Sequence, residues 1–204
     1  ITTILGFGHH GQGSTMGLAP MGQPSMDVSQ FLSAKTRSDY SIHDRGIMEA
    51  FGHLIRDRNG PLQQEHLDLA ASLQNALEET VIRFIEDGLN GRNCDYLCLA
   101  GGVALNCSMN QRLRTHFGLK EMFVQPAAHD AGTSLGAALE AHWLITGDPV
   151  PMTMNHAYFG PSYHRGEVIR ILKSYGVPYT EPEALEEDVA QLIADGAIVC
   201  RFEG

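Results

Sequence analysis

The clearest pattern along the chain is a helical repeat of apolar positions over residues 62–87, with Glu and Gln between them. Residues three and four apart share one face of a helix, so this spacing predicts a long amphipathic helix. We expect Gly88 and Gly91 to end it. The positions of the stripe are Leu69, Leu73, Ala76, Leu77, Thr80, Val81, Phe84 and Ile85.

Short apolar runs and helical patterns alternate after this helix. Residues 95–100 predict a buried strand, and residues 121–125 predict another. A helical pattern follows each strand, the second over 132–145. This alternation is typical of an α/β fold. The residues expected to face inward from the two helices are Leu105, Met109, Leu113, Leu135, Ala138, Leu139, His142 and Trp143.

The N-terminal part carries weaker signals. Residues 1–26 are rich in Gly and Pro, which predicts loops, and residues 27–58 show no period.

A break falls at residues 147–151, where two prolines in three residues exclude a continuous helix or a central strand. We place a boundary within 146–157 and expect one domain at 1–150 and a second α/β unit at 151–204. Because the chain begins with Ile1 rather than Met and ends after an apolar run, we expect a piece of a longer polypeptide. The elements expected in the second unit are helices over 164–175 and 183–194 and strands over 177–180 and 197–202.

Composition narrows the class of protein. With 43% hydrophobic and 19% charged residues, the chain can form a core and is too apolar for intrinsic disorder. No apolar run approaches the roughly 18–20 residues that span a bilayer, and no signal peptide is visible. We therefore expect a soluble, cytoplasmic protein without a membrane partner. A formal net charge of −10 disfavours nucleic acid as a partner.

The cysteines support the same compartment. Cys94, Cys98, Cys107 and Cys200 form no CxxC motif and no dense disulfide framework. We interpret Cys94 and Cys98 as small core residues rather than as metal ligands.

Three short segments carry candidate chemistry. Gly101 and Gly102 follow a predicted strand, where a ligand such as phosphate or ribose could approach the backbone, although a bare tight turn is equally consistent. Asp130 follows the next strand and would cap a helix, ligate a metal or act as a base, with capping favoured when the segment is taken alone. The third segment, from Gly17 to Gly22, reads by itself as a turn.

Taken in order, the three segments resemble one family. MGLAPMG (16–22), LAGGVALNCSMNQRL (99–113) and QPAAHDAGTSLGAALEA (125–141) are similar to the carbamoyltransferases that include nodulation protein U and the cephem and aminoglycoside O-carbamoyltransferases. The similarity covers most of residues 1–145 and continues faintly through YFGPSY (158–163).

The resemblance implies a fold and an activity. The fold is the second half of an actin-like ATPase (ribonuclease H-like) domain over 1–150, followed by the truncated start of a YrdC-like domain over 151–204. The activity is ATP-dependent O-carbamoyl transfer, in which carbamoyl phosphate and ATP give a carbamoyl-adenylate and the carbamoyl group passes to a hydroxyl of a small molecule or glycan.

The resemblance also implies site residues. Gly101, Gly102 and Asn106 would line the nucleotide, with Gly17 and Gly22 beside it. The resemblance makes Asp130 a ligand of a divalent metal, with iron the expected ion.

The sequence departs from the family pattern at two places. The family's other metal ligands, an Asp and a pair of His four residues apart, have no counterpart, and we interpret His9 and His10 as a surface pair. The Arg-rich segment that handles the adenylate is also absent, so this chain alone should lack full turnover. His129 is expected either to lie behind the metal ligands or to be exposed, rather than to be a ligand itself, and Trp143 and Phe159 are expected in the core.

Other functions stay open at this point. A tRNA threonylcarbamoyl transferase or a sugar kinase would share the fold, and a non-catalytic nucleotide-binding module belongs to another class. The acceptor and the oligomeric state, including whether the protein forms a homodimer, are left open.

Overall fold

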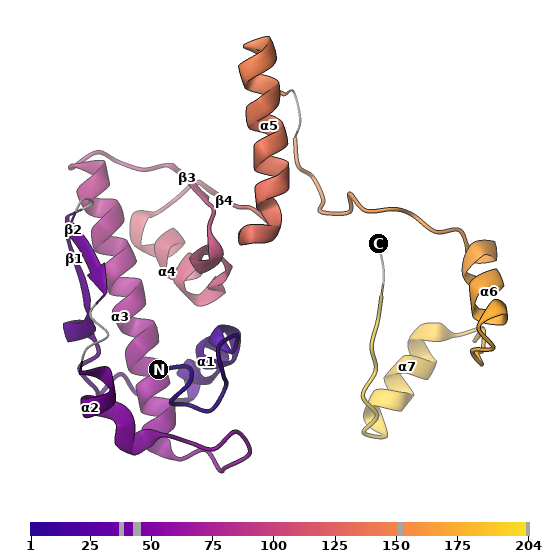
Figure 1. The fold of residues 1–204 in the computed structure, drawn as a ribbon, viewed down its shortest axis with the longest axis horizontal. Helices are drawn as coiled ribbons and strands as arrows, with labels where there is room; N and C mark the ends of the chain where they lie inside the picture. The colour runs from indigo at the N-terminus through magenta and orange to yellow at the C-terminus, as the bar shows by residue number, and fades with distance from the viewer. Residues whose placement is uncertain (37–38, 43–45, 151–152, 203–204) are drawn as a thin grey trace. The chain divides into compact units, whose positions relative to one another are not determined.

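The structure is a computed structural model that describes residues 1–36, 39–42, 46–150 and 153–202. The chain divides into two compact units, Ile1–Val150 and Pro151–Gly204, and each is considered by itself (Figure 1).

Helix α3 (Gln64–Leu89) is the spine of the first unit and confirms the predicted amphipathic helix. Its N-terminus is closed by a capping box between Gln63 and His66, in which the Gln63 N–H donates to His66 Nδ1 over 2.9 Å. The prediction that Gly88 ends the helix is wrong. The helix continues through that residue to Leu89 and is capped by Asn90, which adopts a left-handed conformation with φ 49°.

The hairpin of β1 (Leu32–Thr36) and β2 (Asp39–Ile42) is antiparallel and lies along one side of α3, while α1 (Gln12–Leu18) and α4 (Cys107–Phe117) lie along the other (Figure 1). Short helices complete this part: η1 (Ala19–Met21), η2 (Ser29–Phe31), α2 (Ile47–Phe51) and η3 (Gly52–Leu54). Its core includes Leu5, Val28, Phe31, Phe51 and Leu69.

The loop predicted for residues 1–26 is therefore wrong over α1 and η1. These helices form because Thr15, Leu18 and Ala19 are buried and both helices contact α3, and such tertiary packing outweighs the low helix propensity of the glycines.

A second sheet confirms the predicted order of strand, glycine turn, helix and strand. Strands β3 (Tyr96–Leu99) and β4 (Glu121–Val124) pair in parallel, with Tyr96 opposite Glu121, and α4 connects them after the short helix η4 (Gly102–Leu105). Met109 and Leu113 are buried as predicted, whereas Leu105 is 49% exposed because it precedes α4.

Strand β3 is not the buried strand that the sequence predicts. Leu97 and Leu99 pack toward Ile82 and Leu113, while the alternate residues Tyr96 and Cys98 are exposed. In the described residues this sheet has two strands and one covered face, so only every second side chain enters the core. The prediction of a core role for Cys98 is wrong, whereas Cys94 is half-buried.

Helix α5 (Thr133–Thr146) follows the short helix η5 (Asp130–Gly132) at nearly the predicted bounds, but its predicted inward face is wrong. None of its residues is buried, and Trp143 is 50% exposed. The physical reason is that, within residues 1–36, 39–42 and 46–150, no element covers this helix closely enough to exclude water.

The second unit contains the two predicted helices, α6 (Arg165–Ser174) and α7 (Leu185–Ala194). Over residues 153–202 neither predicted strand forms, because a strand needs a neighbour to pair its N–H and C=O groups and none is present there. Phe159 is 58% exposed, which makes its predicted core position wrong as well.

Across the described residues, the longest helices lack the continuous apolar length that crossing a bilayer requires.

Candidate functional site

Two loops meet at the carboxyl edge of the parallel pair β3–β4. The Gly101 N–H donates to the Ala128 carbonyl over 2.7 Å, and the Gln125 N–H donates to the Leu99 carbonyl over 3.2 Å. These bonds join the Gly101–Gly102 turn to the loop that leads to Asp130. The carboxyl ends of adjacent parallel strands are the usual place for ligands in open α/β sheets.

The glycine turn leaves its backbone open on one side. Gly101 adopts φ 93° and ψ 157°, a conformation that essentially only glycine adopts. A Cβ built at Gly101 or Gly102 would meet no atom within 4 Å, so the backbone faces open space on this side. The turn thus leaves room for a ligand beside the backbone, although the Gly101 N–H itself is already bonded.

Asn106 has a structural role that the sequence reasoning missed. Its Oδ1 accepts from the Met109 N–H over 3.0 Å and so caps α4. Its amide also forms a reciprocal pair with Gln74 of α3, with bonds of 3.0 and 2.8 Å. Asn directly before a helical run is an N-cap signal that the sequence does offer.

Gly22 is required by a close contact with the spine. A Cβ there would lie 2.1 Å from the Leu67 carbonyl oxygen. The next N–H, of Gln23, donates to Asp68 Oδ1 over 2.8 Å. This bond, and a second one from Gln64, lower the pKa of the Asp68 carboxyl. The segment that ends at Gly22 is therefore laid directly against α3.

Gly22 and Asn106 both contact helix α3, Gly22 at Leu67 and Asn106 at Gln74. Leu67 and Gln74 are seven residues apart, which places them on one face of α3 and about 10 Å apart along its axis. Gly17 differs from these residues, since it lies on the exposed side of α1.

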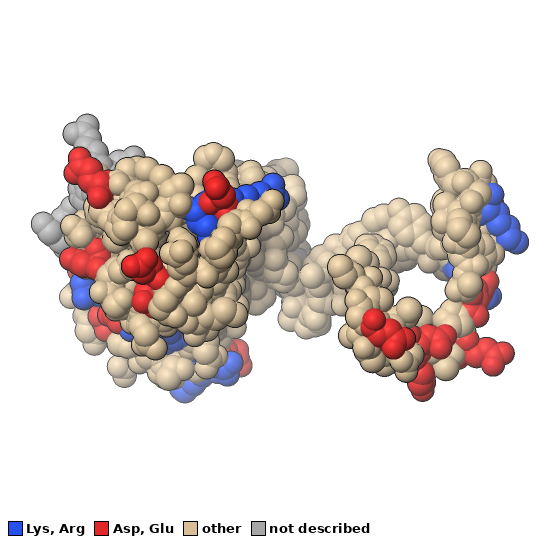
Figure 2. Space-filling model, turned by 90° about the horizontal axis from the view of Figure 1, so that it is seen from below, with Lys and Arg blue, Asp and Glu red and all other residues tan. Residues whose placement is uncertain are grey.

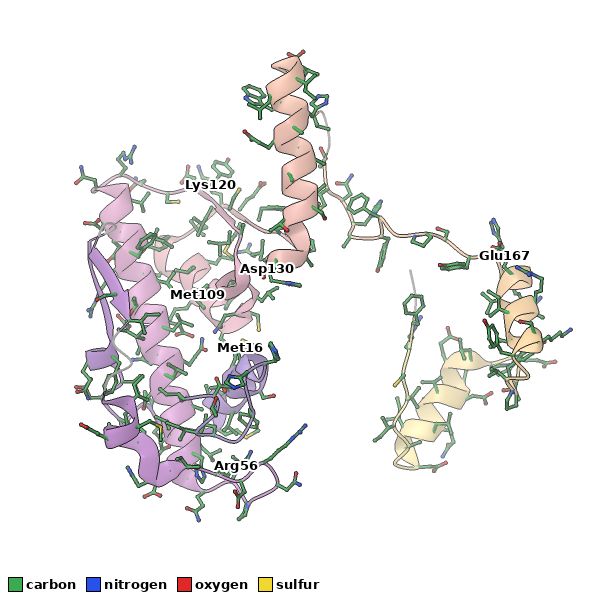
Figure 3. The ribbon with its side chains drawn as sticks, viewed as in Figure 1. Met16, Arg56, Met109, Lys120, Asp130 and Glu167 are labelled. Atoms are coloured by element: carbon green, nitrogen blue, oxygen red, sulfur yellow. The ribbon has the colours of Figure 1, made fainter. Side chains whose placement is uncertain are left out.

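Asp130 is exposed at the start of η5, near one end of α5 (Figure 3). The capping role that its segment suggested is wrong: the N-cap of α5 is Gly132, which has no side-chain bond, and at η5 His129 is the cap, since its Nδ1 accepts from the Ala131 N–H over 3.3 Å. The Asp130 backbone carbonyl accepts from Thr133 Oγ1 over 2.6 Å.

The described residues supply only part of the predicted set of metal ligands. No group of three His, Cys, Asp or Glu side chains gathers in the part of the chain that the structure describes. His9 and His10 are exposed, as is His129. Asp130 can thus offer one oxygen ligand, and the described residues by themselves do not form a metal centre.

A comparison with known protein families shows to which family the chain belongs. The family model described as the carbamoyltransferase N-terminus matches residues 1–139. The chain belongs to the carbamoyltransferase family.

Individual relatives show how far the similarity extends. This carbamoyltransferase-family chain is 32% identical to nodulation protein NolO of Bradyrhizobium diazoefficiens over 98% of its own length and 38% of that protein. It is 38% identical to 3'-hydroxymethylcephem-O-carbamoyltransferase of Streptomyces clavuligerus over 26% of the chain and 10% of that protein. It is 29% identical to tRNA N6-adenosine threonylcarbamoyltransferase of Symbiobacterium thermophilum over 56% of the chain and 33% of that protein.

A polar network in this carbamoyltransferase-family chain extends behind Asn106. Gln74 Nε2 donates to Glu78 Oε1 over 2.6 Å, and Glu78 Oε2 accepts from Arg112 of α4 over 2.8 Å. Arg112 also pairs with Glu79, and its hydrogen bond to Glu78 is the main cause that raises the pKa of its guanidinium. No local signal in the sequence predicts this network, because it joins residues more than 30 positions apart.

Proposed function

We propose that this chain is part of an ATP-dependent O-carbamoyltransferase. The complete enzyme would use carbamoyl phosphate and ATP to make a carbamoyl-adenylate and would transfer the carbamoyl group to a hydroxyl of a small molecule or glycan. The observation that carries the proposal is the family match over residues 1–139, which includes both loops at the carboxyl edge of β3 and β4. The chain spans 38% of NolO, so the activity belongs to a longer polypeptide.

The proposed domain arrangement follows the same reasoning. Residues 1–150 would be the second half of an actin-like ATPase (ribonuclease H-like) domain, and 151–204 would begin a YrdC-like domain. The parallel β3–β4 pair with its crossover helix supports the first assignment, since this unit is an α/β element.

The proposed roles divide between two loops. Gly101 and Gly102 let the nucleotide approach the backbone, and Asn106 offers it an amide N–H. Gly22 places its segment against α3, with Gly17 in the same segment. Asp130 supplies one ligand to a divalent metal, for which iron is our proposal, and the remaining ligands come from outside the described residues.

The test uses the complete polypeptide that contains this chain. It should release pyrophosphate from ATP only when carbamoyl phosphate is present, and should then carbamoylate a hydroxyl acceptor. The absence of carbamoyl phosphate-dependent pyrophosphate release would refute the proposed function.

Asp130→Ala in the complete polypeptide separates the two steps. We expect it to abolish carbamoyl transfer and to spare adenylate formation. In this proposal the exposed Asp130 carboxylate binds the metal that serves the transfer step and takes no part in forming the adenylate. Asp148→Ala, a change at another exposed acid of the first unit, is the control and should leave both steps intact. Equal loss of both steps in Asp130→Ala would mean that Asp130 is structural.

A second candidate is a threonylcarbamoyl transferase acting on tRNA, which the match over 56% of the chain favours. The net charge of −10 argues against it, as do the Lys and Arg side chains, which are dispersed on the face shown in Figure 2. Acidic residues gather on the second unit in that view, where the first turn of α7 holds Glu186, Glu187 and Asp188. Tight tRNA binding at physiological salt would favour this second candidate. ATP binding without any group transfer would instead indicate a non-catalytic module.

A further inference from the structure

In the network behind Asn106, each hydrogen bond can run in one direction only, because the residues at its outer end can only donate or only accept. Arg112 is only a donor, and the ionised Glu78 carboxylate is only an acceptor. Glu78 Oε1 can therefore bond only the NH₂ group of Gln74, over 2.6 Å. This contact sets which way the Gln74 amide points, so that its Oε1 is left to accept.

The other end of the network imposes the same direction. The Met109 N–H needs an acceptor, so Asn106 must turn its Oδ1 toward α4. Asn106 Nδ2 then faces Gln74 Oε1 over 2.8 Å, while Gln74 Nε2 reaches Asn106 Oδ1 over 3.0 Å. Every contact pairs a donor with an acceptor, and neither amide can flip without placing two donors or two acceptors together.

The network is partly shielded from solvent. The Glu78 side chain is 12% exposed, and the pair of amides is half-buried between α3 and α4. A buried polar network that is fully satisfied holds its members in one orientation, since breaking a contact leaves a group without a partner.

We propose that Gln74 is a positioning residue that fixes the Asn106 amide so that Asn106 presents an N–H, and not its carbonyl, to the nucleotide. Both Asn106 Oδ1 lone pairs are used, by Met109 and Gln74, and one of its two Nδ2 hydrogens is used by Gln74. The remaining hydrogen selects an acceptor atom on the ligand, such as a ribose or phosphate oxygen or a ring nitrogen. This inference rests on the proposed function, which places Asn106 at the nucleotide.

The primary variant is Gln74→Glu in the complete polypeptide, measured by equilibrium titration with ATP. A carboxylate at position 74 cannot donate to Asn106 Oδ1 or to Glu78 Oε1, and it repels the Glu78 carboxylate. The side chain at 74 is therefore pushed away from Glu78, and the Asn106 amide loses the partner that fixes its orientation. We expect ATP affinity to fall at least about tenfold, as for loss of a hydrogen bond within a charged network. Gln111→Glu, which adds the same charge at an exposed site on α4, should leave the affinity unchanged.

A double variant restores the direction of the network. In Gln74→Glu with Glu78→Gln, the amide at 78 donates to the carboxylate at 74, accepts from Arg112, and leaves that carboxylate to accept from Asn106 Nδ2. We expect most of the lost ATP affinity to return. Gln74→Met, which fills the space without either bond, should weaken ATP like Gln74→Glu and serves if the latter does not fold.

Asn106→Asp distinguishes positioning from simple capping. The carboxylate still caps α4, so amide hydrogen exchange at Met109 should stay slow, but no N–H remains for the ligand and ATP affinity should fall. Unchanged ATP affinity in Gln74→Glu, when Asn106→Asp weakens ATP, would overturn the positioning role and leave the nucleotide site standing. Unchanged affinity in both variants would overturn the inference and remove Asn106 from the site. A wild-type polypeptide that neither binds ATP nor releases pyrophosphate would refute the proposed function itself.

Discussion

Gly22→Ala and Gly17→Ala are the same chemical change within residues 16–22, and we expect opposite effects on stability. At Gly22 the added Cβ would lie 2.1 Å from the Leu67 carbonyl oxygen and 2.7 Å from the Asp68 nitrogen, and both atoms belong to the backbone of α3. The φ of Gly22 is −112°, which any residue adopts, so the cost arises from the overlap alone.

The size of each effect follows from these surroundings. Overpacking costs about 1–3 kcal/mol, and a helix backbone cannot move away without straining its own hydrogen bonds, so we expect Gly22→Ala to destabilise by about 3 kcal/mol. At Gly17, inside α1, a Cβ meets nothing within 4 Å. Ala in a helix is favoured over Gly by about 0.5–1 kcal/mol, so Gly17→Ala should stabilise.

Thermal unfolding followed by far-ultraviolet circular dichroism measures both variants against the unmodified chain. For a protein of this size 1 kcal/mol shifts Tm by about 2–4 °C, so Gly22→Ala should lower Tm by about 6–12 °C and Gly17→Ala should raise it by about 1–4 °C. Equal shifts for the two variants, or a Gly22→Ala variant within about 1 °C of the unmodified chain, would refute the close contact of this segment with α3.

Two further predictions concern the same unit. Leu113→Ala should lower the free energy of unfolding by about 2–5 kcal/mol in urea titrations because Leu113 is fully buried, whereas Leu144→Ala, at a residue that is 74% exposed, should change it by less than about 0.5 kcal/mol; similar values for both would contradict the packing of α4. The lowered pKa of Asp68, caused first by the Gln23 N–H and then by Gln64, means that its stabilising effect is present above its ordinary value of 3.8 and is lost as pH falls through the lower folded value. Asp68→Asn should therefore lose less stability than the unmodified chain between about pH 6 and about pH 3, and identical pH profiles would exclude this role.

Some of this fold was accessible from local pattern. The apolar stripe of α3 and the order of β3, glycine turn, α4 and β4 follow from periodicity and from glycine punctuation, since each depends on residues close in sequence. The glycines at 101 and 102 are recognisable in the sequence as a turn after a strand, and Gly101 does adopt a conformation reserved for glycine.

Other features depend on contacts that no local pattern contains. Helix α1 forms because α3 buries its apolar side, and α5 stays exposed because no described element of its unit covers it. The terminal apolar run from 197 reads as a strand, but strand formation requires a partner.

The sequence by itself determined which segments form α3, β3, α4 and β4 and which loops resemble those of the carbamoyltransferases, because side-chain spacing and motif order are properties of the linear chain. Only the tertiary structure decided how the candidate residues are used. Gly22 lies against α3 through a contact at 2.1 Å, and Asn106 is bonded to Gln74, 32 positions away. Steric exclusion and hydrogen bonding act between groups that are close in space. Residues far apart in the sequence come that close only when the chain folds.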